Sequence, residues 1–468
     1  MPSTKFPTQL AELSLNDANL NPSLYTNLGS IRKSALSIPN RLHSILADAK
    51  FAKQVSEHYN LPLVANERCG SWYIDPTDKA GSAYFKSTDG HHGQWDFSLR
   101  RLNLQLLPIL GSHGGAVVVD STRRGKNLPD ALSKTVPIWA TVINRALFPE
   151  LPWTHALQHP PTPDNLGQSE ISQIEARLDG FVHAFANLGL DLARLRNELK
   201  HPIHISWAVN GSSDVGNEEP DDEPPSESFE DPREICLRLV LCSASRRVRG
   251  AEISEGGYIQ GAGDDSEGWS HGLNPGVFWK YREELMQSAE DELQELIGTL
   301  LEQERQDSHT RGPVTKILAT SNIYIGVGPV GTVDGFDFVV NCQGDSQKEC
   351  SNLVDLKCRS GKLGSKDLRD KLPGVCDTVG DYLVQHRHDR ILVTCTTGKD
   401  LSAGIVVALL CLFYDDEGRL KENANHRNID KQLVKRRLAW ITQAKPDANP
   451  SRATFRAVNS FLIRQPPD

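Results

Sequence analysis

Hydrophobic residues recur along this chain with two spacings, one typical of amphipathic helices and one typical of buried strands. Between residues 31 and 59 the apolar positions repeat at helical spacing, which predicts amphipathic helices. Short apolar runs at 62–65, 70–74 and 82–85 predict strands, and residues 103–110 predict another helix. The valine-rich run at 115–120 predicts a strand buried on both faces. Open α/β sheets bind ligands at the carboxyl ends of such strands, so the polar loop after this run is a candidate ligand site.

The same alternation continues to the C-terminus and divides the chain into two units. Helical patterns cover 132–144, 170–188 and one long stretch at 279–306, and strand patterns cover 203–209 and 235–242. A second series begins near residue 313, with strands at 317–326, 336–342 and 390–394 and helices at 377–388, 403–414 and a last stretch ending at 463. Strands that alternate with helices predict α/β domains. We therefore expect a mixed α/β domain at 29–308, and a domain with a central sheet flanked by helices at 313–468.

Two polar segments interrupt these patterns. Residues 1–28 are polar and rich in Asn, and are expected to form a flexible tail. Residues 212–234 are acidic and rich in Pro, a composition that cannot bury enough apolar surface to order itself, and predict a disordered insertion. This insertion accounts for the whole formal charge of −9, because the rest of the 468-residue chain is balanced. A nucleic-acid partner would therefore have to contact local basic patches rather than a uniformly basic protein.

The nine cysteines fall at irregular spacings without any Cys-x-x-Cys pair, which indicates neither a zinc nor a disulfide framework. A reducing compartment fits this pattern best. The N-terminus has no apolar signal region, and the longest apolar run, at 403–414, is too short to span a bilayer. We expect a monomeric protein of the cytoplasm, or otherwise of the nucleus, without a membrane partner.

One loop in the second unit has the layout of a phosphate cradle. An apolar strand runs into Cys395, Gly398 and Ser402 and then directly into an apolar helix, so that backbone N–H groups at the helix start can bind an anion. This loop resembles that of dual-specificity phosphatases, and the runs at 317–326 and 336–342 resemble their opening strands. Leu401 stands where those enzymes have an arginine that clamps the phosphoryl group. We expect the cradle without the phosphatase chemistry, with these contacts to phosphate: Cys395, Thr396, Thr397, Gly398, Lys399, Leu401 and Ser402.

Four turns in the first unit, at 67–74, 84–91, 97–103 and 119–126, combine Ser, Thr and Gly with basic residues beside apolar elements. Hydroxyls, backbone amides and guanidinium groups together bind phosphate. A solvated loop with a capping Ser or Asp is the structural alternative for each single turn. The phosphate-binding candidates are Lys86, Ser87, Thr88, Gly90, Arg100, Arg101, Asn103, Ser121, Thr122, Arg123, Arg124, Gly125 and Lys126.

These turns, together with residues 130–139, resemble the initiator-tRNA ribosyl phosphate transferases of fungi and plants. That family also ends in a phosphatase-like domain with a Cys-x-x-Gly-x-Asp-x-Ser loop, which Cys395, Gly398, Asp400 and Ser402 match here. The resemblance covers nearly the whole chain apart from the tail and the acidic insertion. It implies transfer of the 5-phosphoribosyl group of phosphoribosyl pyrophosphate to the 2′-hydroxyl of adenosine 64 in the T-stem of initiator tRNA.

Such a donor carries a phosphate and a pyrophosphate, usually with Mg²⁺, and needs anion cradles, cations and a carboxylate near the metal. Asp400 is unusual inside an anion loop, and we expect Asp400 or Asp120 to help hold Mg²⁺. The 2′-hydroxyl also needs a general base close to the transferred C1′. Asp89, His91 and Asp120 are the candidates, and the strand and loop at 117–125 only faintly resemble the donor loop of ordinary phosphoribosyltransferases.

Acceptor tRNA would lie over basic surface, where phosphate contacts position a stem by shape and by its 2′-hydroxyls. Residues 246–249, 357–371 and 431–437 are the available basic patches, although each alone fits a solvated helix face better than a tRNA contact. Two other functions stay open. The chain could be a dual-specificity-type phosphatase that has replaced the missing arginine, or a binding scaffold for phosphorylated ligands without activity.

Overall fold

The computed structural model describes residues 36–88, 93–123, 125–162, 164, 166–211, 235–248, 254–308, 314–328, 335–343, 352–421 and 429–463. Within them the chain forms the expected two α/β units, each built on a five-stranded sheet. The tail at 1–28 and the acidic insertion at 212–234 lie outside the described residues. None of the helices in the described part is both long and apolar enough to cross a membrane.

The first sheet is entirely parallel. Its strands are β1 (Leu63–Asn66), β2 (Lys79–Ala83), β3 (Gly115–Asp120), β4 (Ile203–Val209) and β5 (Leu237–Ser243). They lie in the order β2-β1-β3-β5-β4, with β3 in the centre. Because all strands run the same way, the polar residues that follow β1, β3 and β5 meet at one edge of the sheet.

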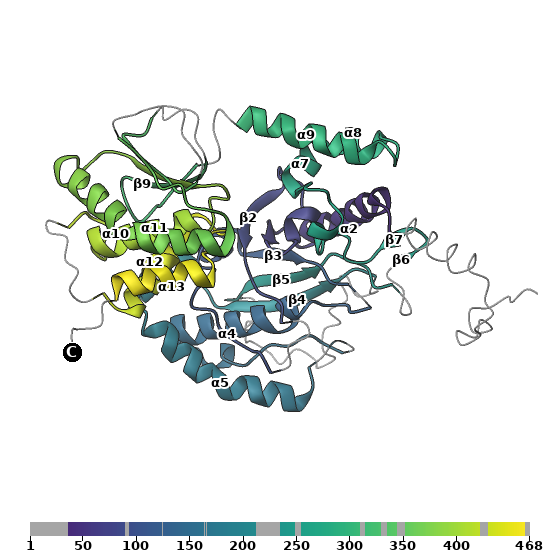
Figure 1. The fold of residues 1–468 in the computed structure, drawn as a ribbon. Coiled ribbons are helices and arrows are strands. Elements are labelled where there is room, and N and C mark those ends of the chain that lie inside the picture. The colour runs from purple at the N-terminus through teal and green to yellow at the C-terminus, as the bar shows by residue number, and fades with distance from the viewer. Residues whose placement is uncertain are drawn as a thin grey trace, which may run out of the picture.

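Helices cover both faces of this sheet (Figure 1). One face packs against α3 (Leu106–His113), α4 (Val136–Leu147), α5 (Gln168–Ala186) and α6 (Leu192–Leu199). The other packs against α2 (Ile38–Tyr59), α7 (Pro275–Lys280), α8 (Arg282–Gln287) and α9 (Leu293–Ser308). Alternate residues of β3 enter the two cores, Val118 into the first and Val119 into the second. The prediction of a strand buried on both faces is thereby confirmed.

Short elements complete the first domain: the 3₁₀ turns η2 (Gly70–Tyr73), η4 (Pro152–Thr154) and η6 (Ser266–Gly268), the π-helical turn η3 (Ala131–Thr135), and the hairpin strands β6 (Ser254–Glu255) and β7 (Tyr258–Ile259). The strand predicted at 70–74 is wrong, because this stretch forms η2. Its aromatic residues pack into the core, and the stretch does not pair as a strand of the sheet. The Trp72 ring centre lies 5.5 Å from that of Trp269. A short apolar run cannot distinguish the two conformations.

The single helix predicted at 279–306 is also wrong, because the chain forms three shorter helices there. Helix α7 ends at Lys280, and α8 ends where Ser288 takes an extended backbone conformation. Periodic apolar positions continue across these breaks because all three helices pack on the same core. Hydrophobic spacing therefore identified the buried face but not the changes in helix direction.

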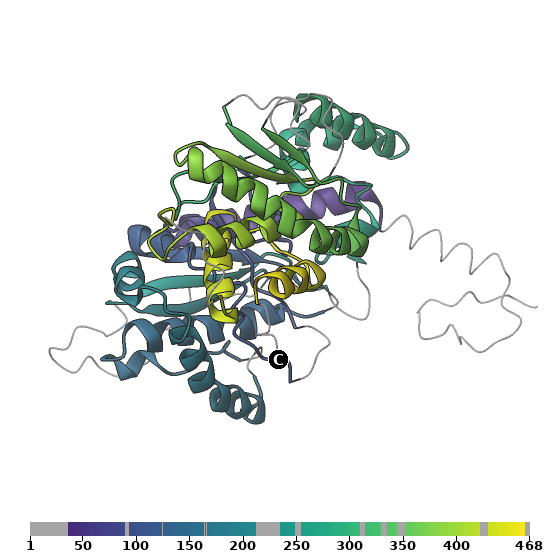
Figure 2. The same ribbon diagram turned by 60° about the vertical axis from the view of Figure 1, so that its left-hand side comes forward.

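The second sheet consists of β8 (Val314–Lys316), β9 (Ile323–Val327), β10 (Phe338–Asn341), β11 (Leu353–Asp355) and β12 (Ile391–Cys395). Their order is β11-β10-β12-β9-β8, parallel except for β8. The helices α10 (Gly361–Gln385), α11 (Leu401–Phe413), α12 (Lys431–Ala444) and α13 (Arg452–Leu462) share one core with it (Figure 2). Helix α10 begins 16 residues before the predicted start at 377. The prediction missed these first turns because they are rich in exposed Lys and Asp, which weaken the apolar pattern.

The two domains contact each other through α12 and α13. From the first domain, the Arg100 guanidinium donates to the carbonyl oxygen of Pro450 and lies 5.1 Å from the ring centre of Phe455. From the second domain, Arg436 Nε donates to the carbonyl oxygen of Leu188 at 2.8 Å. Ala439 of α12 is buried in the core of the first domain. The domains are thus joined by apolar packing and by arginines that reach across in both directions.

Candidate active site at the edge of the first sheet

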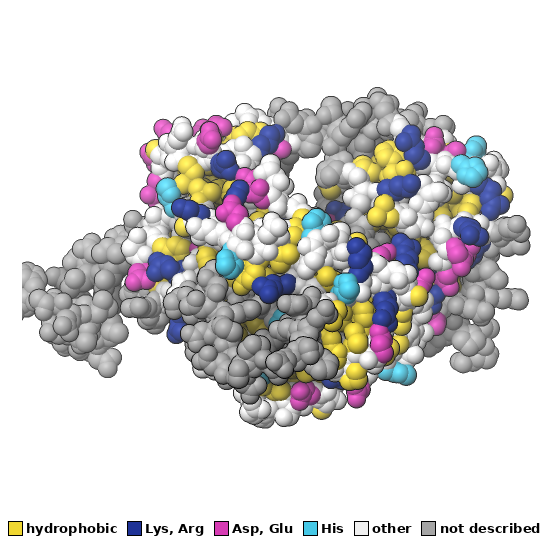
Figure 3. All heavy atoms as spheres, turned by 180° about the vertical axis from the view of Figure 1, so that it is seen from behind, with side chains coloured by type: hydrophobic (Ala, Val, Ile, Leu, Met, Phe, Trp, Pro, Cys, Tyr) yellow, Lys and Arg dark blue, Asp and Glu magenta, His cyan; other side chains and the backbone are white. Residues whose placement is uncertain are grey.

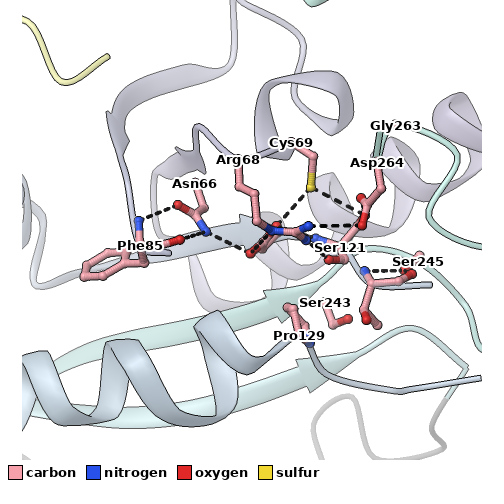
Figure 4. Close-up of polar contacts among 12 residues, drawn as sticks. Asn66, Arg68, Cys69, Phe85, Ser121, Pro129, Ser243, Ser245, Gly263 and Asp264 are labelled. Atoms are coloured by element: carbon pink, nitrogen blue, oxygen red, sulfur yellow. Dashed lines mark hydrogen bonds and ion pairs between the residues drawn. The ribbon is translucent and has the colours of Figure 1, made fainter. Parts of the chain in front are cut away.

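The polar ends of the central strands lie side by side at the carboxyl edge of the first sheet. Asp120 ends β3, is paired in register with Ser243 at the end of β5, and follows the residue that pairs with Ala65 of β1. Figure 4 shows side chains from these ends pointing toward one another, joined by hydrogen bonds and ion pairs. This is the edge at which α/β sheets hold their ligands.

Asp120 is completely buried and fully hydrogen-bonded. Its Oδ2 accepts from Asn66 Nδ2 at 2.8 Å, and its Oδ1 accepts from Arg68 Nη2 at 2.8 Å and Cys69 Sγ at 3.0 Å. The backbone N–H of Ser121 donates to the same Oδ1 at 2.8 Å. A buried carboxylate persists only with such partners. Asp120 therefore organises the loop around it and has no oxygen free of hydrogen bonds.

Arg68 joins the two carboxylates of the site. Besides Asp120, its guanidinium donates to Asp264 Oδ2 at 3.2 Å and to the carbonyl oxygen of Ser121. Burial works against its charge, but the carboxylates of Asp120 and Asp264 raise the pKa of Arg68 above the ordinary value. Burial raises the pKa of the Cys69 thiol well above its usual range, so this sulfur stays protonated. The positive charge of Arg68 is the centre of the network.

The loop after β3 is held by its backbone and by a glycine-rich segment, residues 261–264. Thr122 N donates to Ser245 Oγ at 3.1 Å, and that hydroxyl donates to Thr122 O at 2.7 Å. Ser121 Oγ donates to Asp264. A Cβ on Gly263 would lie 2.8 Å from Trp72 Cβ, so only glycine allows the chain to bring Asp264 this close.

Beyond this network the loop opens into a cavity of about 230 Å³. Asp130 in its wall accepts from Thr88 Oγ1 at 3.1 Å and lies 3.5 Å from both Lys126 Nζ and Lys134 Nζ. The lining residues are Gly125, Lys126, Asn127, Leu128, Asp130, Ser133, Lys134, Asp164, Leu166 and Arg247. The wall is polar and carries cationic groups from three segments of the chain.

The structure brings some of the predicted phosphate-binding residues together. Thr88 reaches the wall of the cavity, Gly125 and Lys126 line it, and Ser121 and Thr122 belong to the loop beside it. Arg123 points elsewhere and forms an ion pair with Asp265. Asp89, Gly90, His91 and Arg124 lie outside the described residues.

Other predicted residues have contacts away from this edge. The Arg101 guanidinium stacks 3.4 Å from the ring centre of Tyr84, and Asn103, at a φ of 51°, holds the backbone of Tyr84 through its amide. Arg100 serves the domain contact. Lys86 is exposed and accepts a hydrogen bond from Thr135 at its carbonyl oxygen, and Ser87 is half-buried. As phosphate ligands these residues stay a prediction.

The Cys395 loop sits at the corresponding edge of the second sheet, between β12 and α11. Burial would raise the pKa of Cys395, but hydrogen bonds from Ser402 and Thr397 hold that pKa below its ordinary value. Ser402 Oγ lies 3.1 Å from the sulfur. Gly398 adopts a φ of 63°, and a Cβ there would lie 3.0 Å from the carbonyl oxygen of Gly326. The turn is therefore built for glycine.

The remaining residues of this loop face inward or bind the protein itself. Leu401 is 4 % exposed and belongs to the apolar core. Thr396 Oγ1 donates to Gln343 Oε1 at 2.8 Å, and Lys399 pairs with Asp447 at 3.2 Å. Asp400 Oδ1 accepts from Ser451 N at 2.7 Å. No cation from the loop replaces the arginine of a phosphatase among these contacts.

The fit of a resident metal ion is poor in the described part of the chain. It contains no group of three His, Cys, Asp or Glu side chains that could hold one. Asp120 accepts hydrogen bonds at both oxygens, and Asp400 is tied to Ser451. Because of these contacts, neither carboxylate is part of a preformed magnesium site.

Several residues of the site carried little signal in the sequence. Arg68 lies in one of the polar turns, but nothing in its spacing distinguishes it from Arg100 or Arg101. Asp264 is the last residue of the glycine-rich segment, and the glycines are the only hint in the sequence that the chain approaches closely there. Asn66, Ser245 and Gln260 became visible only when the strand order brought their segments together.

The structure defines a class of two-domain α/β protein, with a charged site on a parallel sheet and a phosphatase-like domain whose loop lacks the arginine. Residues 31–302 match the family model described as the Rit1 N-terminal domain, and residues 352–462 match the Rit1 DUSP-like domain. The chain belongs to the Rit1 family.

Two relatives are similar over nearly the full length. An uncharacterized protein of Schizosaccharomyces pombe is 36% identical, with 91% of this chain and 94% of that protein covered. The tRNA A64-2'-O-ribosylphosphate transferase of Saccharomyces cerevisiae is 34% identical, with 96% of this chain and 97% of that protein covered. Among solved structures, human DUSP28 is 14% identical with a TM-score of 0.25, and covers 32% of this chain and 93% of its own.

Proposed function

We propose that this protein transfers a ribosyl phosphate group to the 2′-hydroxyl of adenosine 64 in initiator tRNA, with phosphoribosyl pyrophosphate as the donor. The observation that carries the proposal is the 34% identity, over both domains, to the S. cerevisiae tRNA A64-2'-O-ribosylphosphate transferase. The reaction would take place in the cytoplasm, where initiator tRNA is used, and the enzyme would act as a monomer. The modification would keep initiator tRNA out of elongation.

The edge of the first sheet supports donor binding in that domain. A phosphosugar with three charged phosphorus centres needs hydroxyls, amides and cations around a small cavity. Lys126, Lys134 and Arg247 supply cations there, while Asn127 and Ser133 supply neutral polar groups. The Cys395 loop offers backbone N–H groups but has Leu401 in place of a guanidinium. Its role in this proposal is to bind or position RNA phosphate.

In the transfer, the 2′-oxygen of the adenosine forms a bond to C1′ of the donor while the bond from C1′ to the pyrophosphate breaks. Pyrophosphate leaves with the bonding electron pair, and the hydroxyl proton passes to a base. Asp120 would hold Arg68 and the loop in place rather than take this proton, because its oxygens already accept hydrogen bonds. Asp89 and His91 stay the proposed bases.

Magnesium would enter as part of the substrate. Mg²⁺ commonly binds through substrate phosphates and one or two carboxylates while it keeps several waters. Since the described residues build no metal cluster, the donor's pyrophosphate and water would supply most of the ligands of the ion. Asp120 and Asp400 were the carboxylates expected from sequence, and the contacts of both favour a structural role.

One observation favours a second candidate function, a phosphatase. The lowered pKa of Cys395 is what a thiolate nucleophile requires. Against it, the sulfur is buried and Leu401 gives no charge to the transferring phosphoryl group. The lowered pKa is explained by hydrogen bonds from Ser402 and Thr397, which act against burial and would be present without any catalytic role.

The test uses the intact chain with donor labelled in the ribose, initiator tRNA and elongator tRNA. Label in initiator tRNA, lost when adenosine 64 carries a 2′-O-methyl group, would support the transferase. Release of inorganic phosphate from an aryl phosphate, without labelled tRNA, would support the phosphatase instead. Binding of tRNA with neither product would leave a scaffold, and the proposal would be abandoned.

A further inference from the structure

We propose that the cavity between the β3 loop and the segment after β5 is a phosphate subsite, with Arg247 as its principal anion ligand and Gln260 as the residue that positions both walls. Its occupant is the 5-phosphate end of a phosphosugar. That identity rests on the proposed transfer, whereas the anion site rests only on the contacts described below.

The charged side chains around the cavity differ in whether they already have hydrogen-bond or ion-pair partners. Asp164 accepts from Asn127 Nδ2 at 2.9 Å and 3.0 Å, and Asp130 accepts from Thr88 and lies near two lysines. Both acids therefore accept hydrogen bonds, and Asp130 also has cations beside it. Arg247 is exposed at the cavity wall and forms no ion pair with the described residues. A guanidinium left without an acid beside a polar cavity is a ready partner for an incoming phosphate.

Gln260 fixes the two walls relative to each other. Its side chain is 1 % exposed, and its Oε1 accepts from Gly125 N at 3.0 Å on one wall and from Val248 N at 3.1 Å on the other. Its Nε2 donates to Lys126 O at 2.7 Å. The backbone next to Lys126 and the backbone next to Arg247 are thus held by one amide. Both polar atoms of the Gln260 side chain bond to the backbone of these two walls, so the width of the cavity depends on this residue.

The base of the same wall is tied to the sheet. Ser243 Oγ, at the end of β5, donates to Asn127 O at 2.6 Å, which anchors the β3 loop directly above the strand that leads to Arg247. Ser133 also lines the cavity, from the π-helical turn that directly precedes α4. The cavity is therefore built from fixed backbone rather than from surface side chains alone.

Size points to one phosphate and its sugar. At about 230 Å³ the cavity is below the range of roughly 300–1,000 Å³ that small-molecule pockets occupy. It is too small for a nucleotide with its base and is polar throughout its described wall, apart from Leu128 and Leu166. A ribose 5-phosphate group meets both conditions. The pyrophosphate would then extend out of the cavity toward the acceptor.

Calorimetric titration of the intact protein with ribose 5-phosphate and, separately, with pyrophosphate tests the subsite without requiring turnover. We expect Arg247→Gln to weaken ribose 5-phosphate about tenfold or more, as for the loss of a hydrogen bond to a charged group. Pyrophosphate should change by less than about threefold. Arg456→Gln, an exposed arginine of α13, is the matched control and should change neither.

Gln260→Met tests the positioning role. It keeps the volume but removes all three hydrogen bonds, so KM for the donor should rise about tenfold while kcat changes less. Gln158→Met is the control, because Gln158 also donates and accepts with backbone partners but at Ile203 and Ile205, away from the cavity. An equal rise in KM in both variants would mean a general loss of structure and would overturn the role of Gln260.

The outcomes separate the subsite from the function. Unchanged ribose 5-phosphate affinity in Arg247→Gln, or no affinity in the unaltered protein, overturns the subsite even if tRNA is labelled. Arg247-dependent binding without any labelled tRNA keeps the subsite and removes the proposed transferase. Equal weakening of both ligands places the pyrophosphate in this cavity and overturns the assignment to the 5-phosphate.

Discussion

Arg68 shows how a single cation can hold several buried acids at the edge of a sheet. It contacts Asp120 on the β3 loop and Asp264 on the glycine-rich segment, so two distant parts of the chain depend on it. Breaking a buried ion pair leaves the partner charge uncompensated, which costs far more than losing an exposed pair. The consequences of replacing residues in this protein should therefore follow burial rather than charge.

We expect Arg68→Ala to lower the free energy of unfolding by roughly 3–5 kcal/mol, because two nearly buried carboxylates lose their shared cation. Urea denaturation followed by circular dichroism measures this. Arg194→Ala is the comparison, since Arg194 pairs with Glu198 but its side chain is 76% exposed. That variant should lose less than about 1 kcal/mol, and similar losses in both would contradict the importance of burial.

Asp48 provides a prediction about pH. It is fully buried, and burial raises its pKa well above the ordinary value of 3.8, against a hydrogen bond from Tyr258. Between pH 3.8 and the raised pKa, the folded protein therefore keeps this carboxyl protonated while the unfolded chain ionises it. Its contribution to stability is complete below pH 3.8 and is lost progressively as the pH rises toward the folded pKa.

Asp48→Asn removes that penalty and keeps the acceptor Oδ1 used by Tyr258 and Asn210. We expect this variant to match the unaltered protein near pH 4 and to be increasingly more stable at pH 6 and pH 8, by about 1.4 kcal/mol for each unit by which the pKa is raised. Urea midpoints at the three pH values give the answer. A constant difference across them would show that Asp48 does not titrate as inferred.

At this scale the sequence could identify types of chemistry but not partners. The polar turns predicted phosphate binding at Arg100, Arg101 and Asn103, which stays a prediction, and each of them makes structural contacts in the described part of the chain. Composition is the same for a guanidinium that binds phosphate and one that stacks on Tyr84. Only the fold decides which of the two applies.

At the scale of elements, the parallel strands and the loops after them explain both the successes and the errors. The strand at 115–120 was predicted correctly because three consecutive valines have few alternatives to a buried strand, and the strand at 203–209 because apolar residues occupy every second position. The error at 70–74 arose because Trp72 and Tyr73 are buried in a tight turn, where no periodicity applies. The Cys395 loop was placed correctly, between a strand and a helix.

We expect Leu401→Arg not to restore phosphatase activity. Leu401 is directed into the core against Gly364 of α10, where a Cβ would lie 3.4 Å from Leu401 Cδ1. An arginine there would be a buried unpaired charge and should destabilise the protein by several kcal/mol. Aryl phosphate hydrolysis and urea midpoints check both parts. Leu401→Met, which conserves volume, should cost less than about 1.5 kcal/mol.

Cys395→Ser tests the same loop from the other side. If the loop binds anions without acting on them, tRNA labelling should stay within about threefold of the unaltered protein, because a hydroxyl can replace the thiol in the contacts with Ser402 and Thr397. A loss of labelling of about a thousandfold would assign the sulfur a covalent role and would contradict our description of the loop.

At the scale of the whole molecule, two features matter, the balanced surface and the fixed domain contact. Figure 3 shows basic and acidic side chains interspersed over the described surface of that face, as expected from a chain whose charge is balanced outside the acidic insertion. Arg100 and Arg436 cross the interface in opposite directions, and the pKa of Arg100 is lowered by burial and by Arg452. The tRNA would therefore be recognised by particular basic patches rather than by a uniformly basic surface.

We expect the double variant Arg100→Ala, Arg436→Ala to loosen the domain contact while each domain stays folded. Limited trypsin digestion should then separate the two domains several times faster, and donor KM should change less than tRNA KM. The double variant Arg194→Ala, Arg359→Ala removes two arginines that each pair with an acid of their own domain, and serves as the control. Equal cleavage of the two double variants would show that the arginines do not hold the domains together.

Ala439 has one more implication. This small residue of the second domain is part of the apolar core of the first domain. Deleting the phosphatase-like domain would therefore expose apolar surface on the domain that remains. The second domain therefore has a structural task in the packing of the first, in addition to any ligand that its Cys395 loop binds.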